Sequence, residues 1–349
     1  MHMLYKEYIN IKELILHKIG SKACNEGAIL SNEPIILDED LNELLKTYFL
    51  RPFRSEEYYN LAHSSDLNLN EIYHFAHELF NQRVSFVDVS KKIAAYLYEC
   101  SAHPNIKRGE LYIVYFKDCI LDGKTTDAIG IFKSENKDKF IKVYSTSSGF
   151  GIEPNEGISI NKLDKGCLIF NCQEENGYVL SIIDNTNKAQ GSDAKYWTDS
   201  FLHVKPRHDS YQQTNQIISF CKKFTEQIEP TTDIGKLEKI NIMSRALEGL
   251  SDGCNSINAL ATRIFNTDTE RTNFSEYVKS CQGMTDESLE DIITINTDVL
   301  KKALKKRESI KLDKSFEIRI LDSSNRNIIR GFDVEREMFF YTLFFKKEI

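Results

Sequence analysis

Two apolar segments joined by Asp122-Gly123 constrain the fold of this 349-residue chain more than any other feature. GELYIVYFKDCIL precedes the dipeptide and DAIGIFKS follows it, and both are rich in β-branched and aromatic residues. Asp-Gly accepts the positive φ angles of a tight two-residue turn. The pattern therefore predicts a β-hairpin and, with it, an antiparallel sheet.

Other segments of the first half extend this sheet and cover it. KGCLIFNCQ and GYVLSIID are predicted to form a second hairpin, joined near Gly177, and alternation between residues 8 and 36 predicts a short strand pair near Gly27. Apolar residues at helical spacing predict three helices, over residues 38–51, 72–80 and 86–100.

After Trp197 the apolar spacing becomes helical, and the length of the chain favours two domains. We place them at residues 1–205 and 206–349. Helices are predicted in the second domain, the longest from Thr285 to Arg307, and FEIRIL, IIRGFDV and MFFYTLFF are predicted as closing strands. The predicted fold class is α+β: an N-terminal antiparallel sheet with helices, then a mainly helical region ending in a C-terminal β-meander.

The composition points to a cytoplasmic protein that does not enter a membrane. MFFYTLFF, the longest apolar run, is far too short to span a bilayer, and the N-terminal segment lacks a signal-peptide pattern. Eight cysteines without a CxxC pair are typical of reduced thiols.

The charge is distributed unevenly along the sequence. The net charge is −7, but residues 299–349 hold 13 Lys/Arg and 8 Asp/Glu, so the acidic excess lies in residues 1–298. A protein with this balance does not coat nucleic acid by bulk electrostatics. Any DNA contact must be local, and the C-terminal segment is its predicted place.

The order of segments carries a family resemblance over nearly the whole chain. It rests on SFVDVSKKIAAYLYE leading into GELYIVYF, on DAIGIFK, on ISINKL and YWTDSFLHVKPR, and on SINALATRIF and FSEYV before a basic stretch and FEIRIL. These segments resemble the bacterial nucleoid-associated protein family of the NdpA type. The resemblance implies a nucleoid-associated, non-enzymatic protein of the cytoplasm. It also implies double-stranded DNA as a partner, bound with little sequence specificity, and leaves room for nucleoid or DNA-topology proteins.

The strongest DNA-binding candidates lie in LKKALKKRESIKLDKSFEIR. Lysines at i, i+1, i+4 and i+5 share one helical face and could follow a phosphate backbone. The candidates are Lys301, Lys302, Lys305, Lys306, Arg307, Lys311 and Lys314. The alternative is a solvated helix end, because the helix predicted from Thr285 begins with acidic residues and ends with lysines, as its macrodipole favours.

A weaker set of basic residues lies near predicted aromatic or loop segments and could also hold phosphates. It comprises Lys205, Arg207, Lys222, Lys223, Lys107 and Arg108. Ordinary solvated surface is the competing interpretation.

Two other functional classes compete with direct DNA binding. An adaptor that reaches the nucleoid through a protein partner would not be hindered by an acidic surface. A metal-dependent nuclease would need carboxylates and a lysine, for which Glu110, Asp127 and Lys133 are the candidates. Neither a GxGxxG nor a GxxxxGK[ST] motif occurs, and His203 and His208 lack metal-ligand spacing, so we expect no catalytic residue, cofactor or metal.

Overall fold

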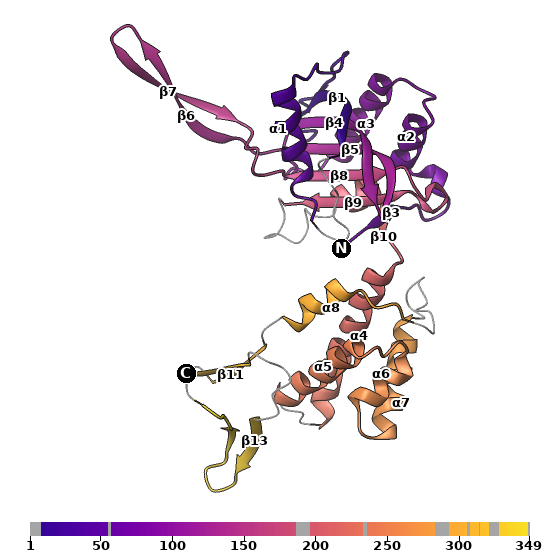
Figure 1. The fold of residues 1–349 in the computed structure, drawn as a ribbon, viewed down its shortest axis with the longest axis vertical. Helices are drawn as coiled ribbons and strands as arrows, with labels where there is room; N and C mark the ends of the chain where they lie inside the picture. The colour runs from indigo at the N-terminus through magenta and orange to yellow at the C-terminus, as the bar shows by residue number, and fades with distance from the viewer. Residues whose placement is uncertain are drawn as a thin grey trace. The chain divides into compact units, whose positions relative to one another are not determined.

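The structure is a computed structural model that describes residues 8–54, 57–185, 196–232, 236–282, 293–305, 308–313, 315–320 and 328–347. The chain divides into two compact units, residues 1–207 and residues 208–349. Figure 1 shows the elements of each unit.

Unit 1 is built on an eight-stranded antiparallel sheet with the order β10-β3-β9-β8-β5-β4-β1-β2. Its strands are β1 (Asn10–Ile19), β2 (Ala28–Ile29), β3 (Tyr59–Leu61), β4 (Gly109–Leu121), β5 (Lys124–Ser134), β8 (Lys165–Phe170), β9 (Val179–Asp184) and β10 (Val204–Pro206). Both predicted hairpins, β4–β5 and β8–β9, are confirmed. Asp122 and Gly123 adopt φ angles of 49° and 75°, as the tight turn requires.

Helices bury both faces of this sheet, which explains why its central strands are apolar almost throughout. The helix α1 (Glu39–Leu50) covers one face, where Phe49 stacks on Phe132 with ring centroids 4.4 Å apart. The helices α2 (Glu71–Phe80) and α3 (Phe86–Cys100) pack on the other face with the π-helical segment η3 (Tyr196–Leu202). In Figure 1, α1 lies on the opposite side of the sheet from α2 and α3.

Two further strands of unit 1 leave the sheet. The strands β6 (Asp138–Thr146) and β7 (Gly149–Gly157) pair only with each other among the described strands, and they project as a ribbon from the end of β5 (Figure 1). We call this pair the arm. It is not predicted from the sequence, where Gly149 and Gly151 are considered only as parts of a missing nucleotide-binding motif.

Unit 2 is helical and ends in two strand pairs, which confirms the predicted fold class. Its helices are α4 (Ser210–Thr232), α5 (Lys236–Ser251), α6 (Ile257–Ile264), α7 (Asp268–Gln282) and α8 (Thr297–Leu304). Its strands are β11 (Glu308–Leu312), β12 (Phe316–Ile320), β13 (Ile328–Asp333) and β14 (Met338–Leu343), paired β11–β12 and β13–β14. The helices enclose a core in which Phe224 contacts Phe265 and Phe274.

The single helix predicted from Thr285 to Arg307 is wrong, because residues 293–296 are not helical. Side chains of α4 accept hydrogen bonds from the backbone amides of this stretch. The Gln213 side chain accepts from the Thr294 amide, and the Thr214 hydroxyl accepts from the Asn296 amide. Those amides are satisfied without helical hydrogen bonds. The acidic residues 286–291 lie outside the described residues, and α8 is a separate eight-residue helix.

The cysteines of the chain are free thiols. All eight are described, and none forms a disulfide. Within the described residues, no helix is both long and apolar enough to cross a membrane.

A buried histidine makes the stability of unit 1 depend on pH. The Nδ1 atom of His17 accepts from the Ser31 amide, so Nε2–H donates to the Ser90 hydroxyl, 3.0 Å away. Burial, and secondarily Lys91, lowers the pKa of His17 to about 4. Because the unfolded chain takes up this proton near pH 6.5 and the folded chain does not, stability is lost as the pH falls from about 6.5 toward 4.

We expect this group alone to remove about 1–2 kcal/mol between pH 7 and pH 4.5, after discounting for solvent screening. Urea unfolding at both pH values measures it. The control is His17→Asn, which keeps an acceptor for the Ser31 amide and has no ionisable group. An equal pH dependence in the variant would contradict the assignment.

Candidate nucleic-acid interface

The helix α8 carries three of the predicted lysines in a well-anchored position. The Asn296 side chain accepts from the amides of Asp298 and Val299, 3.1 Å from each, and so caps the helix. Val299 and Leu300 are buried, and α8 packs against α4 and α5. Its lysines face solvent: Lys301, Lys302 and, at the C-cap, Lys305.

These three lysines differ in their neighbours. The ammonium group of Lys301 lies 3.7 Å from the Asp298 carboxylate, a loose and exposed ion pair. Within the described chain, neither Lys302 nor Lys305 forms an ion pair. No carboxylate of the described residues therefore neutralises either charge, and the buried Val299 and Leu300 anchor the helix that carries them.

The remaining C-terminal candidates are only partly described. Lys311 is exposed on β11, directly opposite Glu317 of β12. The pKa of Glu317 is lowered first by a hydrogen bond from the Ser309 side chain, then by Arg319, with a smaller effect of Lys311. Lys311 thus has a carboxylate nearby that weakens its attraction for phosphate. Lys306, Arg307 and Lys314 lie outside the described residues.

A second pair of lysines lies on α4 of the same unit. Lys222 and Lys223 are exposed, whereas Cys221 and Phe224 on either side of them point into the core. This helix is the one to which the segment before α8 is hydrogen-bonded through Thr214. Unit 2 therefore carries exposed lysines on two helices that pack together.

The weaker candidates of unit 1 are mostly engaged. Arg207 forms an ion pair with Asp122 at 3.1 Å and lies over the Tyr58 ring. Arg108 pairs with Glu26 at 3.2 Å, and Lys107 donates to Asn136. Lys205, exposed on β10, is the one of these residues with no described ion pair or hydrogen bond of its side chain.

The three nuclease candidates do not converge. Glu110 pairs with Lys137 at 2.8 Å, and Asp127 pairs with Lys117 at 2.6 Å. Asp127 and Lys133 are six residues apart on β5, which corresponds to roughly 20 Å along a strand. Glu110 lies opposite Ser134, and so on the other face of the sheet from Lys133. The described residues also contain no cluster of three His, Cys, Asp or Glu side chains that could hold a metal.

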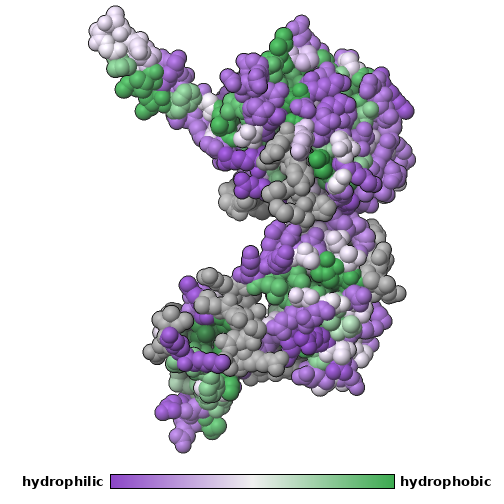
Figure 2. All heavy atoms as spheres, viewed as in Figure 1, coloured by the Kyte–Doolittle hydropathy of each residue, from purple (hydrophilic) through white to green (hydrophobic). Residues whose placement is uncertain are grey.

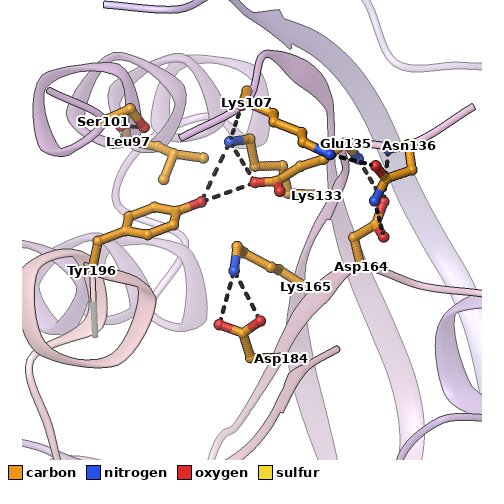
Figure 3. Close-up of polar contacts among 10 residues, drawn as sticks. All are labelled: Leu97, Ser101, Lys107, Lys133, Glu135, Asn136, Asp164, Lys165, Asp184 and Tyr196. Atoms are coloured by element: carbon orange, nitrogen blue, oxygen red, sulfur yellow. Dashed lines mark hydrogen bonds and ion pairs between the residues drawn. The ribbon is translucent and has the colours of Figure 1, made fainter. Parts of the chain in front are cut away.

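Lys133 instead belongs to a buried ionic cluster, drawn in Figure 3. Its ammonium group lies 2.9 Å from Glu135 Oε1, donates to the Lys107 carbonyl at 2.7 Å and contacts the Tyr196 hydroxyl at 3.3 Å. The side chains of Lys133 and Glu135 are only 0% and 5% exposed. Burial lowers the pKa of Lys133, and Glu135 opposes this effect. The cluster ties the end of β5 to η3.

A second part of the cluster holds the base of the arm. The Asp164 carboxylate is buried and accepts from the backbone amides of Glu135 and Asn136, at 2.7 and 2.9 Å, and from the Asn136 side chain. Lys165, the next residue, pairs with Asp184 at 2.8 Å. Figure 3 shows both sets of contacts. Because residues 135–136 lead into β6 and Asp164 follows β7, this carboxylate joins the two ends of the arm.

Neither the arm nor the ionic cluster is among the sites predicted from the sequence. The β-branched and aromatic residues of KFIKVYST, with the Ser-Ser-Gly that follows them, are a usable signal for the arm. Lys133 and Lys165 each stand at the end of an apolar strand, where a lysine is normally exposed, so sequence offered no signal for their burial.

Comparison with known protein families places this chain. A family model described as nucleoid-associated protein YejK matches residues 15–338, which is nearly the whole chain. The matched range includes the sheet of unit 1 from the middle of β1 onward, the arm and the helices of unit 2. No curated protein matches the sequence.

Proposed function

Because the chain belongs to this family of nucleoid-associated proteins, we propose that it binds double-stranded DNA directly, through phosphate contacts made by unit 2 and without catalysis. The observation that supports the proposal is the exposed lysine row of α8, in which Lys302 and Lys305 have no described carboxylate partner on a helix that is fixed to the core. Lys222 and Lys223, exposed on α4, are further candidates for phosphate contacts.

Contacts of this kind position a protein on DNA but do not specify a sequence, because every phosphate carries the same charge. A helix-turn-helix formed by α6 and α7 would read base edges, but the structure gives it little support. Phe274 and Val278 of α7 are buried in the core of unit 2, which leaves Lys279 as the single basic residue in the second half of that helix. We therefore infer little sequence preference.

The test is fluorescence anisotropy of the full chain with a labelled duplex across a salt series. The variant Lys302→Ala/Lys305→Ala should weaken binding for every duplex sequence and reduce the salt slope of log K by roughly 2, about one for each phosphate that the protein no longer neutralises. The matched control is Lys91→Ala/Lys92→Ala, which removes two adjacent lysines from α3 of unit 1. It removes the same charge, but the ammonium groups of these lysines already contact Asn32 and Glu78. The control should keep the wild-type slope.

Two results would contradict the proposal. No binding of naked duplex at low salt would favour the adaptor function, with which the net charge of −7 is compatible. Loss of intact duplex in the presence of Mg²⁺ would indicate a nuclease.

A further inference from the structure

The two faces of the arm differ in how far its own side chains cover them. On one face the Tyr144 ring lies closely over Gly151 and the Phe140 ring over Gly157. Lys142 pairs with Glu153 between these two contacts, at 3.3 Å. Rings over glycines in the opposite strand cover the backbone that the missing side chains would leave bare. Phe140 and Tyr144 remain 50% and 43% exposed, so these contacts cover the face in part; we call it the closed face.

The other face is bare. It carries Ile141, Val143, Phe150 and Ile152, which are between 61% and 81% exposed. The strand register places Ile141 opposite Pro154 and Val143 opposite Ile152, so the apolar residues form one continuous strip, which we call the apolar face. Figure 2 shows hydrophobic residues along the projecting arm. Contiguous exposed apolar surface marks an interaction site, and an isolated two-stranded ribbon is only marginally stable in water.

The charge of the arm argues against DNA as the occupant of the apolar face. Residues 138–157 contain two lysines, Lys139 and Lys142, and three acidic residues, Asp138, Glu153 and Glu156. One of the lysines is already paired with Glu153. A ribbon with a net negative charge gains nothing from the phosphate backbone, which dominates protein–DNA affinity.

The register of the arm makes the apolar face complementary to itself. We propose that the apolar faces of two copies of this chain pack together, with the arms parallel about a twofold axis that runs along them. Such an axis places β6 of one copy over β7 of the other. Each residue of the apolar face then contacts, in the other copy, the residue that lies opposite it in its own arm.

Three kinds of contact then match. Lys139 lies opposite Glu156 in the register, so it faces the partner's Glu156. The twofold axis produces the same ion pair a second time, between Glu156 and the partner's Lys139. Val143 faces the partner's Ile152, apolar against apolar. Phe150 faces the partner's Ser145, a large side chain against a small one. The same surface thus supplies both halves of a charge-matched and size-matched interface.

The first experiment measures the mass of the full chain by sedimentation equilibrium between about 1 and 100 µM. An interface smaller than the usual ~800 Å² per partner predicts micromolar affinity, so the mass should rise from 40.3 kDa toward twice that value. Ile152→Asp should weaken the dimer by roughly 100-fold or more, since the change occurs twice per interface. Asn155→Asp adds the same charge on the closed face and should leave the dimer unchanged.

The second experiment separates self-association from damage to the arm. Lys139→Glu and Glu156→Lys each place like charges opposite one another, and each should weaken its own dimer by about tenfold. An equimolar mixture of the two variants should recover wild-type affinity, because the mixed dimer restores both opposite-charge pairs. Damage within a single arm would not be repaired by mixing.

Several outcomes would overturn the proposal. These are a wild-type chain that stays monomeric at 100 µM, an Ile152→Asp variant that dimerises normally, and a mixture that does not recover. A normal dimer with reduced duplex affinity in Ile152→Asp would assign the apolar face to DNA instead. The dimer does not depend on DNA binding, so each proposal can fail without the other.

Discussion

Replacing Glu135 by alanine is expected to destabilise unit 1 by about 3–5 kcal/mol, because it leaves the ammonium group of Lys133 buried without its carboxylate. Neither the Lys107 carbonyl nor the Tyr196 hydroxyl carries a compensating negative charge. Urea unfolding at pH 7, followed by the fluorescence of Trp197 in unit 1, measures the loss.

The pH dependence of the same variant identifies the cause. Burial lowers the pKa of Lys133 and Glu135 opposes that effect, so the variant should have a lower lysine pKa than the wild type. The unfolded chain then binds a proton that the folded variant does not, and stability rises with pH up to about 10.4. The deficit measured at pH 7 should therefore shrink by pH 9.5.

The control removes both charges. Lys133→Met/Glu135→Leu leaves no unpaired ion, and replacing a buried pair by apolar groups of similar size is often close to neutral. It should lose much less stability than Glu135→Ala alone, and its deficit should not shrink at high pH. A double variant as unstable as the single one would mean that packing at this position, and not charge, determines the effect.

The sheet could be predicted because its signals are local. The tight turn between β4 and β5 requires positive φ angles, which Asp122-Gly123 accepts and few other dipeptides do. This turn fixes the β4–β5 register. The burial of both faces follows from strands that are apolar throughout. Such information lies within a few residues of where it acts.

The functional surfaces could be predicted less well because they depend on distant residues. Arg207 is paired with Asp122, 85 residues earlier, and Arg108 with Glu26, 82 residues earlier, so neither is the free cation that its sequence context suggests. Of the predicted Thr285–Arg307 helix, the described residues form only α8. Side chains of α4 accept hydrogen bonds from the backbone amides that precede α8, so these amides do not form helical hydrogen bonds. The lysine-rich sequence therefore indicates where a candidate surface lies, but it does not indicate which basic side chains form ion pairs with distant residues.

Asp164→Ala should be strongly destabilising at the base of the arm. Its carboxylate accepts three hydrogen bonds, from two backbone amides and the Asn136 side chain, and the residue is almost fully buried. Hydrogen bonds to a charged group contribute about 1.5–3 kcal/mol each, and buried amides left without acceptors add to the loss. With partial rescue by water, we expect about 3 kcal/mol in urea unfolding of the full chain.

The position of Asp164 predicts a second effect that a core residue would not have. The residues it joins lead into β6 and follow β7, so the variant should release the two ends of the arm and weaken the proposed dimer at temperatures where unit 1 is still folded. Asp164→Asn keeps one acceptor for the amides and should lose roughly half as much stability. Phe132→Ala is the matched comparison: it should cost about 3–5 kcal/mol by leaving a cavity beside Phe49, with the dimer affinity of the folded chain unchanged. Equal effects of Asp164→Ala and Phe132→Ala on dimer affinity would show that the arm is not held through Asp164.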